Sequence, residues 1–298
     1  MVSGRKVTDG GEPMAATLRN VTTYDLKLAA PLAVGFVVFF ITPLFILLAL
    51  SFQTDPQGSH YGLTQYVNFL GDRFSLGVLG STLWLGVKVT ALTLLLGYPV
   101  AWLHQRAPGW AKGIIMLLVL LPLLTSVVVR TFAWVVILGR QGIVNATLAG
   151  LGLIDTPLKL LYTDGGVVVA LAQVQMPLMV LPLITALSRI DPNLADASSV
   201  LGAGHWRTFR KVILPLSLPG IVAGCLLTYA AAITAFITQS LIGGGQMLFM
   251  PMYIYQQAST LQNWPFAAAI SIVFLVAVLV VVSIFNVLGR LSRGYTNA

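Results

Sequence analysis

The stretch Asp196-Ala-Ser-Ser-Val-Leu-Gly202, followed after nine residues by Val212-Ile-Leu-Pro215, lies between two long apolar runs. The polar segment that contains it, residues 189–216, is 28 residues long. Neighbouring helices are usually joined by about 2 to 8 residues, so this segment is too long for a simple turn. We call it the elbow and expect it to have secondary structure of its own.

The elbow has the signals of two short helices separated by a break. Asp191-Pro192 is typical of a helix start. The sequence predicts a first helix over 193–201, a glycine-containing break over 202–204, and a second helix over 205–212 that ends before Pro215. An exposed helix–break–helix segment of this kind suits docking to a soluble partner. The alternative is an ordinary amphipathic loop.

Outside the elbow the chain is strongly apolar. Of 298 residues, 57% are hydrophobic and 9% are charged, whereas about 25% of a soluble domain is charged. A helix needs about 20 apolar residues to cross the ~30 Å hydrocarbon core of a bilayer. Runs of that length occupy residues 28–52, 76–103, 113–138, 166–188, 217–242 and 265–288. We expect an all-α integral membrane protein with six transmembrane helices.

The distribution of basic residues predicts the orientation, because Lys and Arg are retained on the cytoplasmic side of short loops. Only three basic residues fall in the outer loops if both termini are cytoplasmic, and twelve of the seventeen fall inside. These twelve are Arg5, Lys6, Arg19, Lys27, Arg106, Lys112, Arg189, Arg207, Arg210, Lys211, Arg290 and Arg293. The elbow is then cytoplasmic. The same topology accounts for the net charge of +8, so nucleic-acid binding is not expected.

We expect two regions along the chain, a cytoplasmic tail over 1–27 and a membrane domain over 28–298. The tail is polar, and we expect it to be loose or to end in a short interfacial helix over 21–27. The apolar run that follows exceeds the ~7 to 15 residues of a signal-peptide core, so we expect an uncleaved anchor.

The elbow resembles the EAA motif of ABC importer permeases, which reads Glu-Ala-Ala, three residues, Gly, nine residues, Ile, one residue, Leu-Pro. The spacing matches throughout. Residues that agree are Ala197, Gly202, Leu214 and Pro215, and those that differ are Asp196 for Glu, Ser198 for Ala and Val212 for Ile. The resemblance implies the MetI-like fold of type I importers. It also implies that the elbow couples to an ATPase through Asp196, Ala197, Gly202, Arg207, Leu214 and Pro215.

Other stretches resemble the PotB-type permeases of spermidine/putrescine importers. They are Gly97-Tyr-Pro-Val-Ala-Trp102, Arg130, Gly152-Leu-Ile-Asp155-Thr-Pro157, Leu160-Leu-Tyr-Thr163 and Asn263-Trp-Pro-Phe-Ala267. The resemblance implies a bacterial inner-membrane complex with an ABC ATPase dimer, a second permease of PotC type, and a periplasmic or surface substrate-binding protein, in contact with membrane lipid. It implies a polyamine substrate, with an opine, an amino-acid-like compound or an aminophosphonate as alternatives.

The chain has no phosphate-binding loop of the Gly-x-x-x-x-Gly-Lys-Ser/Thr type. We therefore expect ATP and Mg²⁺ on a partner ATPase, no cofactor in this chain and no catalytic residue. No metal site is expected, because the three histidines lack ligand spacing and Cys225 is the one cysteine. A secondary transporter or a structural assembly factor would leave the long elbow without a role.

Two ionisable residues lie within the predicted spans, where charge is costly and commonly functional. Lys88 lies roughly 18 Å and Arg130 roughly 12 Å below the outer ends of their spans at 1.5 Å per residue. Trp134 follows Arg130 by one turn, so both can line the substrate path. The alternative is that Arg130 extends to the outer lipid headgroups or pairs with a loop carboxylate such as Asp155 or Asp164.

The fifth predicted span has a face of small or polar residues. Gly220 and Gly224 on it favour close helix packing, whereas Gln239, near its outer end, is placed to meet a substrate. Tyr229 and Trp134 are aromatic candidates for the path, because aromatic faces attract cations. No Asp or Glu lies within the six expected spans, which disfavours a polyamine unless a partner supplies the carboxylates.

Overall fold

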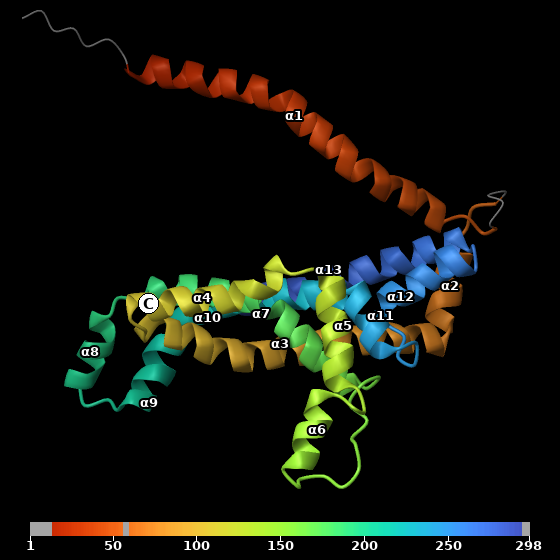
Figure 1. Ribbon diagram of the computed structural model, residues 1–298. Coiled ribbons are helices and arrows are strands. Elements are labelled where there is room, and N and C mark those ends of the chain that lie inside the picture. The colour runs from red at the N-terminus through yellow and green to blue at the C-terminus, as the bar shows by residue number, and fades with distance from the viewer. Residues whose placement is uncertain (1–13, 56–59, 294–298) are drawn as a thin grey trace, which may run out of the picture. The chain divides into compact units, whose positions relative to one another are not determined.

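The computed structural model describes residues 14–55 and 60–293 (Figure 1). The regular structure of these residues is helical, apart from an isolated bridge between Gln53 and Tyr61. The helices are α1 (Met14–Ser51), α2 (Thr64–Gly71), α3 (Arg73–Arg106), α4 (Gly109–Leu124), α5 (Val127–Leu138), α6 (Ile143–Gly150), α7 (Asp164–Ser188), α8 (Asn193–Val200), α9 (His205–Thr208), the π-helix η1 (Phe209–Ile213), α10 (Leu214–Ile233), α11 (Phe236–Gly243), α12 (Met250–Tyr255), the π-helix η2 (Gln256–Thr260) and α13 (Trp264–Arg293). The all-α fold class is confirmed.

The chain divides into two units, residues 1–50 and residues 51–298. Helix α1 makes up the described part of the first unit. It begins at Met14, so residues 14–27 of the expected tail are helical. This agrees with the alternative of a helix over 21–27, whereas the expectation of a loose segment is wrong for residues 14–20. Residues 1–13 of the expected tail lie outside the described residues.

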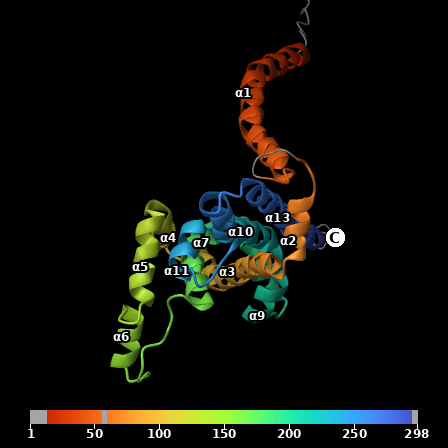
Figure 2. The same ribbon diagram turned by 90° about the vertical axis from the view of Figure 1, so that its right-hand side faces the viewer.

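Helices α3, α7 and α10 pack against one another at the centre of the second unit (Figures 1 and 2). Glycines allow the close approach of α10 to α7, as expected. A Cβ atom added at Gly220 would lie 2.4 Å from the Cβ atom of Ala186, and one added at Gly224 would lie 2.8 Å from the sulfur of Met179. Helix α4 packs on α7, and α13 packs on α10.

Helix α3 begins at a capped turn. The Asp72 carboxylate accepts hydrogen bonds from the backbone N–H groups of Phe74 and Ser75 and from the Ser75 hydroxyl, at 3.1, 3.0 and 2.6 Å. The hydrogen bond from the Ser75 side chain, followed by the backbone hydrogen bonds, holds the pKa of the Asp72 carboxyl below its usual range. This cap fixes the end of α3 that lies opposite the elbow (Figure 1).

Six stretches of the described residues are long and apolar enough to cross a membrane, which confirms the expected number. They are residues 30–51, 73–106, 127–150, 164–188, 205–233 and 264–285. The third differs from the expected span over 113–138. There the chain forms two helices, α4 and α5, which are separated at Thr125 and Ser126. A single helix over that range is therefore a wrong prediction.

The fifth expected span, 217–242, is also broken. Helix α10 ends at Ile233, and α11 begins at Phe236 after Thr234 and Ala235. Both breaks lie inside apolar sequence. Non-helical backbone at membrane depth is tolerated where it is buried in protein or lines a polar cavity, so the two breaks are candidates for a functional site.

The elbow forms the predicted helix–break–helix segment, with α8 as its first helix and residues 201–204 as its break. The prediction that its second helix ends before Pro215 is wrong. Helix α9 continues through η1 into α10, so helical structure runs from His205 to Ile233. The π-turn is the physical reason: the Leu214 N–H bonds the Phe209 carbonyl, and the widened turn makes room for the Pro215 ring.

Candidate functional site

The tip of the elbow exposes large apolar side chains. Val200 and Leu201 are 88% and 86% exposed, and Trp206 is 72% exposed. Between them, Gly202 has a φ of 77°, in the left-handed region that other residues rarely adopt. In a polar loop outside the bilayer, such an apolar tip is typical of a docking surface.

The two arms of the elbow are joined by a hydrogen bond. Ser198 of α8 and Thr208 of α9 lie with their hydroxyl oxygens 3.0 Å apart. Asp196 and Ala197 are exposed on α8 beside this contact, and Arg207 is exposed on α9. The contact holds the arms at a fixed spacing.

An aromatic cluster joins the elbow to α3. The ring of Phe209 meets the rings of Tyr98 and Trp102 edge-on, with centroids 5.7 and 5.4 Å apart, and stacks on Trp206 at 5.5 Å. The guanidinium of Arg106 lies 4.4 Å above the Trp102 ring. Leu214 and Pro215 follow this cluster at the start of α10. Packed rings therefore connect the elbow to α3, in addition to the helix that continues from the elbow into α10.

Each helix break is capped by a long polar side chain from beyond the break. Arg130 of α5 donates to the Pro122 carbonyl of α4 across the first break. At the second, Gln239 of α11 donates from Nε2 to the carbonyls of Ala232 and Ile233, at 2.8 and 3.3 Å. The Ala232 carbonyl also accepts from the Ala235 N–H at 3.4 Å. Both carbonyls lie where α10 ends and its regular helical donors stop, so the side-chain amide supplements the backbone donors there.

The segments that follow the two breaks contact each other. The hydroxyls of Thr131 in α5 and Thr238 in α11 lie 3.2 Å apart and are both buried. Trp134, one turn beyond Arg130, is half-buried and donates from Nε1 to the amide oxygen of Gln173 in α7, at 3.2 Å. These contacts make a polar region between α5, α7 and α11, formed by Thr131, Trp134, Gln173 and Thr238. Arg130 and Gln239 instead bond the carbonyls at the two breaks.

Gln239 is 1% exposed, and its Oε1 atom has no hydrogen-bond partner. Contact with a substrate would need the second break to open. Tyr229 of α10 is completely buried between α3 and α13, with its ring against Gly86 and Phe285. Its place on a substrate path stays a prediction that requires a large rearrangement of these two helices.

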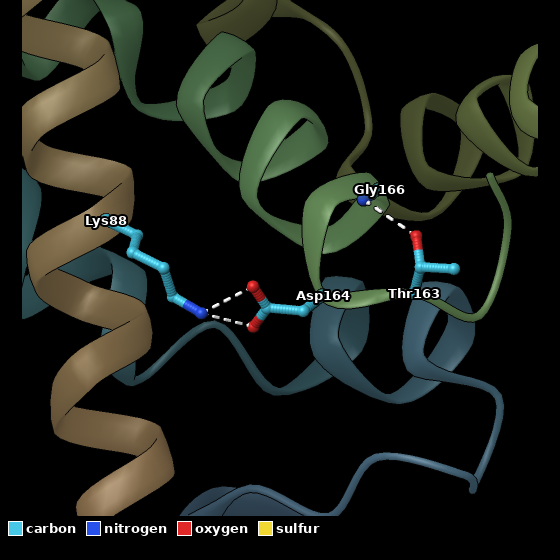
Figure 3. Close-up of polar contacts among 4 residues, drawn as sticks. All are labelled: Lys88, Thr163, Asp164 and Gly166. Carbon is cyan, nitrogen blue, oxygen red and sulfur yellow. Dashed lines mark hydrogen bonds and ion pairs between the residues drawn. The ribbon is translucent and has the colours of Figure 1, made fainter.

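Lys88 forms an ion pair, which its apolar neighbours in the sequence did not indicate. Its Nζ atom donates to both carboxylate oxygens of Asp164, the first residue of α7 (Figure 3). The alternative pairing of Asp164 with Arg130 is therefore wrong. Helix α7 also starts two residues before the expected span 166–188, so a carboxylate does belong to a span.

Sequence reasoning missed Asp164 as a functional candidate, together with Gln173 and Thr238. Asp164 follows Thr163 and precedes two glycines, and a Thr-Asp pair of this kind is a recognisable helix start. The sequence therefore contained a signal for a helix start at Asp164. Nothing in the sequence indicated that Lys88, 76 residues earlier, would meet it.

The chain is similar to proteins of one family along most of its length. The family described as "Binding-protein-dependent transport system inner membrane component" matches residues 93–293. The spermidine/putrescine transport system permease protein PotB of Haemophilus influenzae is 32% identical over 251 residues, which cover 83% of this chain and 87% of that protein. The protein of the same name from Escherichia coli K12 is 33% identical over 244 residues, which cover 80% and 88%.

A solved structure has the same fold. A chain in the crystal structure of a bacterial ABC transporter that imports the acidic polysaccharide alginate superposes with a TM-score of 0.72 at 20% identity. The superposition covers 92% of this chain and 98% of that chain. At this identity the likeness shows the fold alone.

Proposed function

The chain belongs to the family of binding-protein-dependent transport system inner membrane components, the permease subunits of ABC importers, and from this premise we propose that it forms half of the path by which a polyamine enters a bacterial cell. It is a multi-pass inner-membrane transport subunit and not itself an enzyme. The observation that carries the polyamine assignment is an identity of 32–33% to spermidine/putrescine permeases over four fifths of the chain.

In the sequence, the charged residues expected within the spans are basic, which argues against a cationic substrate. The structure weakens this argument. Lys88 is neutralised by Asp164, whereas Arg130 keeps its charge and donates a hydrogen bond to the Pro122 carbonyl. The polar region between α5, α7 and α11 then offers hydroxyl and amide oxygens together with the indole of Trp134. Oxygen acceptors and an aromatic face are the groups that bind alkylammonium ions. The proposed path residues are Arg130, Trp134, Gln239, Lys88 and Tyr229.

The elbow end of the bundle faces the cytoplasm in this proposal, and both termini lie on that side. Its apolar tip, Val200, Leu201 and Trp206, docks into a groove of the ATPase, while Arg207 lies beside it to meet acidic groups. The coupling residues are Asp196, Ala197, Gly202, Arg207, Leu214 and Pro215. ATP and Mg²⁺ are bound by the ATPase dimer, and a second permease of PotC type forms the other half of the path.

Transport then follows from a shift between two conformations. Closure of the ATPase dimer around ATP moves the two elbows together and favours an outward-open path, to which the substrate-binding protein delivers its ligand. Hydrolysis of ATP returns the path to the inward-open state. The helix breaks give α4–α5 and α10–α11 places at which their outer parts can move relative to their inner parts.

The experiment that tests the substrate assignment is ATPase activity of the complete complex in lipid nanodiscs. The cognate binding protein is added with putrescine, spermidine, an opine, a neutral amino acid or an aminophosphonate, and the complex without binding protein is the control. We expect stimulation by the two polyamines alone. Stimulation only by a zwitterionic or anionic compound would overturn the polyamine assignment and leave the ABC importer assignment intact.

A further inference from the structure

The ion pair between Lys88 and Asp164 lies where a solute can reach it. The side chain of Lys88 is 28% exposed and that of Asp164 is 45% exposed. Lys88 lies 15 residues along α3, roughly 22 Å from the start of this helix at 1.5 Å per residue. Asp164 begins α7, on the helix that packs most closely beside α3. The pair is thus an accessible charged contact between two central helices.

The carboxylate is held on a rigid turn (Figure 3). Thr163 caps α7: its hydroxyl accepts from the Gly166 N–H at 3.2 Å and donates to the Leu160 carbonyl at 2.6 Å. A Cβ atom at Gly166 would lie 2.4 Å from that same carbonyl oxygen, so only glycine fits there. Asp164 is therefore positioned before any ligand arrives, as a binding group should be.

The group that Asp164 binds in the structure is an alkylammonium. The Lys88 side chain is a four-carbon stem that ends in an ammonium group, and one end of putrescine, a four-carbon diamine, has the same chemistry. We infer that Asp164 is the carboxylate that receives an ammonium group of the transported polyamine, and that Lys88 occupies it as a tethered counter-ion between transport events. This inference rests on the proposed function.

A replaceable counter-ion suits transport better than an empty site. An unpaired carboxylate between two transmembrane helices carries an energetic cost even when it is partly exposed, and Lys88 lowers this cost while no substrate is bound. Exchange of one alkylammonium for another leaves the number of ionic contacts on Asp164 unchanged. The released Lys88 ammonium repels the bound polyamine, which keeps binding weak enough for release.

The surface around Lys88 fits the same ligand. Trp84 precedes Lys88 by four residues, so the two side chains lie on one face of α3. Trp84 is 60% exposed, and this face carries the small residues Gly77 and Gly80. An exposed indole beside a carboxylate offers a second attraction for ammonium groups. A polyamine with one end on Asp164 can thus place another on Trp84.

The simplest alternative is an ion pair that only fastens α3 to α7. Four variants distinguish our inference from this alternative. They are Asp164→Asn, Asp164→Glu, Lys88→Met and the exchange variant, which combines Lys88→Asp with Asp164→Lys. Each full complex is reconstituted in proteoliposomes with saturating putrescine-loaded binding protein. Putrescine uptake and ATP hydrolysis are measured on the same preparation, and size-exclusion profiles report assembly.

The inference predicts that Asp164→Asn lowers uptake about tenfold or more, since a charge-assisted contact to the substrate is lost, while stimulated ATP hydrolysis stays within about twofold. Asp164→Glu and Lys88→Met both keep a carboxylate at the site, so each should lose less uptake than Asp164→Asn. Lys88→Met should also release putrescine more slowly, because the competing ammonium group is gone. The exchange variant retains an ion pair but places the carboxylate on the wrong helix, so uptake should not recover.

Recovery of uptake in the exchange variant would overturn the inference and leave a purely structural ion pair. Equal losses of putrescine uptake in Asp164→Asn and Lys88→Met would also overturn the inference. Wild-type complex that hydrolyses ATP but takes up no putrescine would instead refute the polyamine assignment, so the two failures are distinguishable.

Discussion

Substitution of Gly220 by alanine should weaken the contact between α10 and α7. The added Cβ atom would lie 2.4 Å from the Cβ atom of Ala186 and 2.8 Å from the carbonyl oxygen of Pro182. Both distances are well below the sum of the van der Waals radii of the two atoms. Neither neighbour is the end of a flexible side chain, so the two helices must move apart to relieve the clash.

Whether Gly220→Ala raises or lowers the stability of the protein depends on two opposing contributions. Replacing glycine by alanine within a helix favours the helix by about 0.8 to 1 kcal/mol. Overpacking of a close contact costs about 1 to 3 kcal/mol, and the upper part of that range applies where a backbone carbonyl is struck. We therefore expect a net loss of about 1 to 2 kcal/mol. Gly80→Ala in α3 is the matched control, because nothing lies within 4 Å of the added Cβ atom there and only the favourable term remains.

The assay is the midpoint of thermal unfolding of the detergent-purified complex, followed by the monodisperse fraction on size exclusion after heating. We expect the order Gly80→Ala, wild type, Gly220→Ala from the most to the least stable. Combination of Gly220→Ala with Ala186→Gly should recover part of the loss, since one of the two clashes disappears. A midpoint for Gly220→Ala at or above that of Gly80→Ala would refute the packing argument.

Three further outcomes follow from single contacts. Leu201→Asp at the elbow tip should abolish co-purification of the ATPase, whereas Leu153→Asp, at another exposed loop leucine, should not. Retained ATPase binding by Leu201→Asp would remove the docking role. Gln239→Met leaves the Ile233 carbonyl unpaired and the Ala232 carbonyl with backbone donors alone, but it also removes an unsatisfied oxygen, so a net loss of about 1 kcal/mol in the free energy of unfolding is expected, read as a lower midpoint of thermal unfolding. Thr208→Val deletes the hydrogen bond to Ser198 and should reduce uptake per ATP hydrolysed without changing assembly, a prediction that unchanged coupling would contradict.

The elbow shows what sequence can predict in this chain. Its first helix was expected over 193–201 and is found at Asn193–Val200, because local signals such as Asp191-Pro192 and Gly202 determine where short helices start and stop. The six spans follow from hydropathy for a similar reason: the bilayer imposes one length on every apolar helix.

The helix breaks could not be predicted in the same way. Hydropathy averages over a window, and residues 113–138 are apolar on both sides of Thr125 and Ser126. Pro122 was the one local signal near the first break, and no comparable signal precedes Thr234. The breaks are stabilised by contacts between distant residues, such as Thr131 with Thr238, and the partner of Lys88 was hidden for the same reason.

Helix α10 joins the elbow to the second break. Its 20 residues extend about 30 Å at 1.5 Å per residue, from η1 to the break before α11. A tilt of about 10° at one end of a straight rod of this length displaces the other end by about 5 Å. The π-turn before Pro215 and the proline inside α10, Pro219, are both places at which helices bend, so they divide the connection between the elbow and the break into short segments that can change their angles separately.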